Sequence, residues 1–125
     1  MVKLKYNKGS SAERELMRFL ESNNYIVARI AGSGKNNNPD ILAFKHGLQY
    51  AFECKNWNND YLHLNKNQIE GLKRWEEVSG ISTYIAWKNK EWYFIHYKEL
   101  EENNKGYSIT LQKAKLINRK LDWLL

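Results

Sequence analysis

Two short apolar runs joined by His46-Gly47 constrain the fold of this chain more than any other feature of its sequence. The runs cover residues 41–44 and 48–52, and strand-like segments on either side of a glycine-containing two-residue turn predict a β-hairpin. With that turn, residues whose numbers add up to 93 pair across the strands, and Asp40 lies directly opposite Glu53. Cβ atoms in such a pair are roughly 5 Å apart, and like charges facing each other there destabilise a sheet. The pair therefore requires a function that offsets its cost.

Lys55 adds an amine to the two carboxylates, because it lies two residues after Glu53 and so points to the same face of the strand. Two carboxylates and an amine on one face indicate a metal-dependent phosphodiesterase site. Carboxylate oxygens suit Mg²⁺, the main-chain carbonyl of Cys54 is a further candidate ligand, and a lysine there can orient the attacking water or neutralise developing charge. The alternative, an exposed Glu53–Lys55 pair at a sheet edge, explains the lysine well and the opposed carboxylates poorly.

Glu13 has two interpretations. The spacing from Ser10 to Glu13 is that of a capping box, in which the glutamate reaches back to the backbone N–H of the serine. On a helical wheel, however, Glu13 lies inside the apolar stripe formed with Leu16 and Leu20, where an acid is costly unless it has a partner. A metal site would supply that partner. Glu13 is therefore the candidate for a third carboxylate, and Glu15, which falls outside the stripe, is not.

Composition narrows the class of protein. The 125 residues, 42% of them hydrophobic, predict one folded domain. A net charge of +6 favours a polyanionic partner, most often nucleic acid. Cys54 is the only cysteine, which rules out an internal disulfide and favours a reducing compartment; we expect it to face the core as a small apolar side chain. No apolar run approaches the ~18 residues that span a bilayer. We expect an intracellular, cytoplasmic protein with no membrane partner.

The periodicity of the chain predicts an α/β domain with a mixed central β-sheet flanked by helices. Gly80 should end the second helix, and Gln68 should either cap that helix or touch the site. We divide the chain into a basic N-terminal arm (1–9), a core (10–96) and a variable C-terminal segment (97–125). In chain order, the expected elements are a helix (10–23), strands (25–30, 41–44 and 48–52), a helix (66–78), strands (83–87 and 92–95) and a tail (112–125) that forms a helix or a packing arm.

The five tryptophans are interpreted as core or interface residues rather than as platforms for base stacking. Trp92 and Phe94 fall on one strand face and are candidates for a subunit contact. The three histidines have no metal-ligand spacing, and we assign them no role.

The assembled pattern resembles the PD-(D/E)xK nuclease superfamily and, more narrowly, the archaeal-type Holliday junction resolvases of cells and archaeal viruses. The resemblance runs from Lys8 to about Ile95 and predicts a restriction-endonuclease-like core. The motifs that carry it are Lys8-Gly9-Ser10 with Glu13-Arg14-Glu15, Arg29, Gly32-Ser33-Gly34, Pro39-Asp40-Ile41 and Glu53-Cys54-Lys55.

The resemblance implies a homodimeric endonuclease, dependent on Mg²⁺ with Mn²⁺ as an alternative, that binds four-way DNA junctions by structure and nicks two opposed strands. By the same resemblance, Glu13, Asp40 and Glu53 correspond to the metal-binding acids. Lys55 corresponds to the catalytic lysine, and Ser33 to the loop serine of the site. If the protein is encoded by a virus, we expect it to act inside the infected host cell. The expected DNA-binding residues are Lys3, Lys5, Lys8, Arg14, Arg29 and Lys35.

Two alternative functions remain open at the level of sequence. One is a different nuclease on the same fold, acting in repair on flaps or ends, which the motif does not distinguish from a resolvase. The other is a DNA-binding module that retains the fold without the chemistry. The presence of every candidate acid and of the lysine argues against the second alternative.

Overall fold

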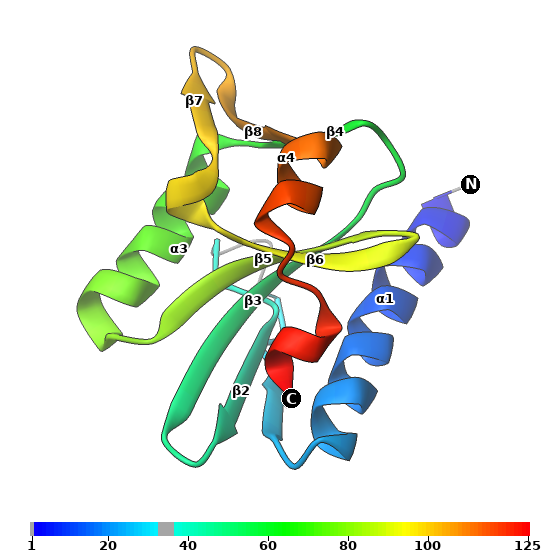
Figure 1. The fold of residues 1–125 in the computed structure, drawn as a ribbon, viewed down its shortest axis with the longest axis vertical. Helices are drawn as coiled ribbons and strands as arrows, with labels where there is room; N and C mark the ends of the chain where they lie inside the picture. The colour runs from blue at the N-terminus through cyan, green and yellow to red at the C-terminus, as the bar shows by residue number, and fades with distance from the viewer. Residues whose placement is uncertain (1, 33–36) are drawn as a thin grey trace.

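The computed structural model describes the backbone of residues 2–32 and 37–125, and the side chains from residue 11 onward within those ranges. Figure 1 shows the arrangement of its elements. The helices and strands, in chain order, are α1 (Val2–Ser22), β1 (Ile26–Arg29), β2 (Ile41–Lys45), β3 (Leu48–Asn56), β4 (Tyr61–Leu64), α3 (Lys66–Ser79), β5 (Ser82–Asn89), β6 (Glu91–His96), the 3₁₀ turn η1 (Tyr97–Glu99), β7 (Glu101–Asn103), β8 (Gly106–Thr110), α4 (Leu111–Ile117) and the 3₁₀ turn η2 (Leu121–Leu124).

The described strands form two sheets. One has five strands in the order β1-β2-β3-β5-β6, and the other has three in the order β4-β8-β7. The β3–β5 pair is parallel, whereas the other pairs of the large sheet are antiparallel, so the predicted mixed sheet is confirmed. The β3–β5 connection contains α3, as a parallel crossover requires.

The two faces of the large sheet are covered by different helices. Successive residues of a strand point to opposite faces, and Ile85 packs with Leu72 of α3, whereas Ala86 packs with Leu16 of α1. The small sheet and α4 extend the α3 side of the core through residues such as Ile109. Alternate residues of β3 therefore face either the α1 side or the α3 side of the sheet.

The hairpin between β2 and β3 has the predicted register. Ile41 pairs with Phe52 and Lys45 with Leu48, so paired residue numbers add up to 93. His46 and Gly47 both have positive φ, at 46° and 83°. Positive φ at both central positions is the geometry of a type I′ turn, which matches the twist of the flanking strands. The turn therefore determines which residues of β3 lie near the start of β2.

Helix α3 also agrees with prediction. The Asn65 side chain accepts a hydrogen bond from the Gln68 N–H at 2.8 Å, and the Gln68 side chain accepts one from the Asn65 N–H at 3.2 Å, which completes a capping box. Gly80 ends the helix with φ of 79°. Of the two roles considered for Gln68, the structure shows the cap.

Three expectations about the fold are wrong. Helix α1 begins at Val2 rather than at Ser10, so the serine is not at a helix start and the proposed Ser10–Glu13 capping box does not exist. Trp92 and Phe94 do not form an exposed face for a subunit. They are buried against α1, 3% and 0% exposed, with their rings stacked at 6.2 Å. The third error is the small sheet, since its strands β4, β7 and β8 are absent from the predicted elements.

None of the helices in the described part of the chain is both long and apolar enough to cross a lipid bilayer.

Candidate active site

Asp40 lies immediately before β2, one residue beyond the β2–β3 ladder. Its backbone N–H donates to the Phe52 carbonyl at 2.8 Å, and its carbonyl accepts from the Ile30 N–H at 2.9 Å. Its carboxylate accepts a hydrogen bond from the Cys54 N–H at 2.8 Å. The backbone of Asp40 is thus held between β1 and β3, while its carboxylate is oriented by β3 itself.

Glu53 and Lys55 emerge from β3 on the α3 side of the sheet, next to Asp40. They pair with Ile85 and Trp87 of β5, which belong to the α3 side of the core. The Lys55 Nζ lies 3.6 Å from the Glu53 Oε2, and the two side chains are only 28% and 14% exposed. The predicted convergence of these side chains on one face is confirmed.

Burial raises the pKa of Glu53 to about 8, and the charge of Asp40 and, less strongly, that of Glu13 act in the same direction. Lys55 lowers the pKa but offsets these effects only in part. Without a further positive charge, the Glu53 carboxyl is therefore mostly protonated at neutral pH. This is the energetic consequence of burying Glu53 beside a second carboxylate.

Cys54 has the opposite orientation, as expected. Its side chain packs against the core on the α1 side, and burial, reinforced by the nearby acids, raises its pKa well above the ordinary value. A buried thiol of this kind stays protonated and is a poor nucleophile. Cys54 therefore contributes its backbone N–H to the site and its side chain to the core.

Glu13 reaches the site from α1, where its Oε1 accepts a hydrogen bond from Arg29 Nε at 3.0 Å. It is close enough to influence the pKa of Glu53. Among the described residues, no group of three or more His, Cys, Asp or Glu side chains is gathered tightly enough to enclose a metal ion. In this arrangement Glu13 is occupied by Arg29 rather than grouped with Asp40 and Glu53.

The structure describes only some of the predicted DNA-binding residues and does not describe Ser33. Arg14 lies exposed on α1, and Arg29 is half-exposed at the end of β1. Lys3, Lys5 and Lys8 belong to the first turns of α1, but their side chains lie outside the described part of the chain. Ser33 and Lys35 also lie outside the described residues.

Comparison with known proteins settles the relationship of this chain. Residues 4–121 match the family model for the archaeal Holliday junction resolvase (Hjc). The chain belongs to this family. It is 42% identical over 106 residues to the crossover junction endodeoxyribonuclease Hjc of Methanocaldococcus jannaschii, covering 84% of this chain and 77% of the relative. It is 32% identical over 104 residues to Hjc of Sulfolobus acidocaldarius, covering 79% and 73%.

A solved structure gives the same result for the fold. The Hjc of Archaeoglobus fulgidus, described as a Holliday junction resolvase from an archaeal hyperthermophile, matches this chain with a TM-score of 0.78. The sequence identity is 28%, and the match covers 87% of this chain and 88% of the other. The resemblance to the resolvases and the restriction-endonuclease-like core predicted from the sequence are confirmed. A family of nucleases of this type also implies a divalent-metal requirement.

One residue that positions the site of this Hjc-family chain was missed in the sequence. Gly71, in the middle of α3, lies against the backbone of Asn37, and a Cβ atom added to Gly71 would overlap the Asn37 carbonyl oxygen. Beside it, Trp75 Nε1 donates to Asn38 Oδ1 at 3.0 Å. The segment 37–39 that leads into Asp40 is therefore seated directly on α3. A glycine inside a helix destabilises it by roughly 0.5–1 kcal/mol relative to alanine. Its presence in the middle of a predicted helix was therefore the sequence signal that another backbone segment packs closely there.

Replacing Gly71 with alanine should displace residues 37–39 and move Asp40, even though alanine is the better helix former. We expect nuclease activity to fall by about 100-fold, since a shift of about 1 Å in a reacting group can cost that much. Junction cleavage and circular dichroism would be measured in parallel with Asn67→Ala, an exposed change on the same helix. Wild-type cleavage by a folded Gly71→Ala protein would show that the contact does not position the site.

Proposed function

We propose that this chain is a structure-selective endonuclease that resolves four-way DNA junctions by paired, Mg²⁺-dependent hydrolysis, with Asp40 and Glu53 as metal ligands. The observation that carries the proposal is the convergence of Asp40, Glu53 and Lys55 at the start of β2 and on β3, where the Asp40 carboxylate is held by the Cys54 N–H and the Lys55 Nζ lies 3.6 Å from Glu53 Oε2. The names of the relatives, which are crossover junction endodeoxyribonucleases, support the choice of substrate.

The donor set fits a hard divalent cation. Asp40 and Glu53 offer carboxylate oxygens. Because burial beside Asp40 raises the pKa of Glu53 to about 8, a further positive charge at this point would favour its ionisation. Mg²⁺ prefers a site with one or two carboxylates that leaves room for water and substrate phosphate. When bound, the ion would polarise the phosphate and lower the pKa of a water molecule.

The other predicted site residues have supporting roles in the proposal. Lys55, whose Nζ lies 3.6 Å from Glu53 Oε2, is proposed to orient the attacking water or to neutralise charge on the phosphate. Glu13 would act as the third acid after exchanging its partner Arg29 for the metal site, and the released guanidinium could then bind phosphate. Ser33 is proposed as a loop contact to the phosphate or to metal-bound water.

Binding of DNA is proposed to come from basic residues around this site. The net charge of +6 favours a polyanion. Arg14 lies on α1, whose first turns include Lys3, Lys5 and Lys8. Arg29, at the end of β1, is bonded to Glu13 of the same helix. Lys35 is proposed to contribute from the segment before Asp40. Phosphate contacts of this kind give affinity without sequence preference, which suits a nuclease that selects its substrate by shape.

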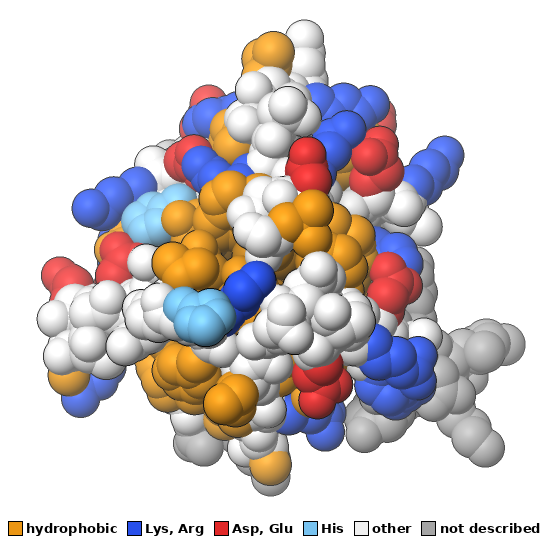
Figure 2. Space-filling view, turned by 60° about the horizontal axis from the view of Figure 1, so that its bottom comes forward, with side chains coloured by type: hydrophobic (Ala, Val, Ile, Leu, Met, Phe, Trp, Pro, Cys, Tyr) orange, Lys and Arg blue, Asp and Glu red, His pale blue; other side chains and the backbone are white. Residues whose placement is uncertain are grey.

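A homodimer is proposed because paired nicks on opposed strands need two sites related by two-fold symmetry. The end of the molecule that carries the β2–β3 turn, at the bottom of Figure 1, comes forward in Figure 2, where hydrophobic side chains gather across it. Ile26 and Phe44, which pair across β1 and β2, are exposed apolar residues of this sheet. An exposed apolar surface of this kind is available for a second copy of the chain.

Asp40→Asn and Glu53→Gln should lower junction cleavage by more than about 100-fold, since even indirect support of a metal ligand is worth about 10–100-fold. Both variants should still bind the junction, because the lost groups hold metal rather than phosphate. The assay uses a labelled four-way junction and the matching linear duplex, each with Mg²⁺ or EDTA, and Glu102→Gln on exposed β7 serves as the control acid.

Each result of this assay supports one function. Nicks confined to the junction and to Mg²⁺ support the resolvase. Equal cutting of the linear duplex would indicate the repair-type nuclease, and junction binding without cleavage would indicate a DNA-binding module. If either acid variant cut at the normal rate, the assigned metal ligands would be wrong.

The dimer makes a separate prediction. When wild-type and Asp40→Asn subunits are mixed and allowed to exchange, heterodimers should nick one strand of the junction and leave its opposite strand intact. Denaturing gels of strand-specifically labelled junctions measure which strands are nicked, and sedimentation velocity establishes the oligomeric state. A monomer in sedimentation, or mixtures that yield only paired cuts and uncut junction, would contradict two cooperating sites.

A further inference from the structure

Two aromatic side chains, Trp57 and Tyr61, are exposed immediately beside the catalytic candidate Lys55. Their exposed fractions are 48% and 56%, whereas Trp87 and Trp92 are buried in the core. Together with Lys55 they line a hollow of about 300 Å³, whose other walls are Asn56, Leu62 and His63. None of these lining residues is acidic. Of the two roles predicted for the tryptophans, core or interface, the core role therefore does not apply to Trp57.

The backbone of Trp57 is held rigidly although its ring is exposed. Its N–H donates to the Lys88 carbonyl at 3.0 Å, and its carbonyl accepts a hydrogen bond from Trp87 Nε1 at 2.8 Å. Both partners belong to β5, the strand that pairs with β3 next to Glu53 and Lys55. The backbone that carries the Trp57 ring beside Lys55 is therefore held by the central sheet.

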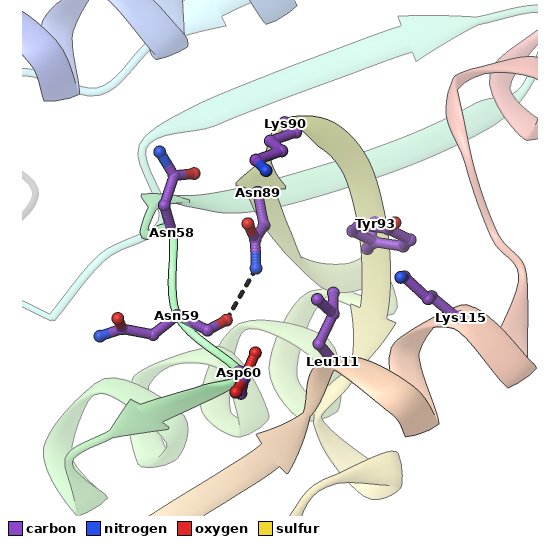
Figure 3. Close-up of a pocket in the computed structure, with 8 residues that line it drawn as sticks. All are labelled: Asn58, Asn59, Asp60, Asn89, Lys90, Tyr93, Leu111 and Lys115. Carbon is purple, nitrogen blue, oxygen red and sulfur yellow. Dashed lines mark hydrogen bonds between the residues drawn. The ribbon is translucent and has the colours of Figure 1, made fainter.

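The residues that follow Trp57 are anchored as well. Asn59 accepts a hydrogen bond on its carbonyl from Asn89 Nδ2 at 2.7 Å, and the Asp60 carbonyl accepts one from the Leu111 N–H at 2.7 Å. Figure 3 shows this segment as one wall of a polar pocket, with the bond from Asn89 dashed. Turning the Asn59 amide over lets its oxygen accept from Trp57 Nε1 at 2.8 Å, which would orient the indole. A surface organised before binding loses little entropy when it receives a ligand.

The chemistry of such a surface favours a nucleobase. Every base has a π face that stacks on an aromatic ring, and each such contact is sequence-tolerant. Within a continuous duplex both faces of a base pair are covered by its neighbours, so the ring would find no free base. At an open four-way junction, the base pairs that border the branch lack a neighbour on one side. The occupant that fits a ring next to Lys55 is therefore a branch-point base.

We propose that Trp57, assisted by Tyr61, forms a stacking platform that covers the exposed face of a branch-point base pair and thereby holds the adjacent phosphodiester at the active site. The inference rests on the proposed function, because Lys55 marks where the cleaved phosphate lies. It adds a source of selectivity: the contact is available at a junction and not in linear duplex.

The test uses a four-way junction carrying 2-aminopurine at the branch position next to the cleaved phosphate. Its fluorescence is read with EDTA present, so that no strand is cut. Stacking on the platform quenches the base, and we expect Trp57→Phe to retain this quenching while Trp57→Leu and Trp57→Ala lose it. In Mg²⁺, single-turnover cleavage of the junction should fall about 5- to 150-fold for the last two variants, the range expected for one lost base–aromatic stack.

The substitutions should leave the fold intact, because both hydrogen bonds that join Trp57 to β5 are made by its backbone N–H and carbonyl. Thermal unfolding and affinity for linear duplex are measured for each variant, and both should match the wild type. Leu116→Ala, a change at a 79% exposed apolar residue on α4, is the control for loss of surface hydrophobicity.

The outcomes separate this inference from the proposed function. Quenching and cleavage that are unchanged in Trp57→Ala would overturn the platform, as would a cleavage defect that Trp57→Leu repairs, since leucine replaces the bulk without a π face. Failure of the metal site would instead appear as normal cutting by Asp40→Asn. The fluorescence signal, read without metal, would still decide the platform in that case.

Discussion

The burial of Glu53 beside the Asp40 carboxylate is the constraint around which the site is organised. Burial and proximity raise the pKa of Glu53 to about 8, and Lys55 offsets this only in part. A sheet without a use for these groups would gain stability by losing one of them. Under the proposed function, a divalent cation would add positive charge at this point, and the same feature that costs stability in the free protein would then provide affinity for metal.

Several parts of the fold maintain this costly pair. The type I′ turn at His46-Gly47 sets the register that brings β3 alongside the start of β2. The alternation of β3 sends Cys54 into the core and Glu53 to the other face, so packing on one side holds the acid on the other. Gly71 lets the segment before Asp40 lie directly on α3. The proposed stacking platform is attached to the same strands, which would keep the stacked base and the cleaved phosphate at a fixed distance and orientation.

Local patterns in the sequence predicted the hairpin, its register and the two ends of α3, because turns, caps and alternation depend on neighbouring residues. The small sheet was missed because its strands have only 3–5 residues and β4 pairs with β8, more than forty positions away. The start of α1 was misplaced because Ser10 resembles a cap but lies inside a helix. Exposure of Trp57 and the contact of Gly71 with Asn37 depend on distant segments, which no single-sequence pattern specifies.

Thermal unfolding with and without Mg²⁺, compared between the wild type and Asp40→Asn, tests the central claim most directly. If burial and Asp40 oppose the ionisation of Glu53 until a cation arrives, Mg²⁺ should raise the Tm of the wild type. Asp40→Asn should be at least as stable as the wild type without metal, since the amide can still accept the Cys54 N–H, and Mg²⁺ should leave its Tm unchanged. A wild-type Tm that ignores Mg²⁺, or a variant that is less stable without metal and still gains from it, would contradict the account.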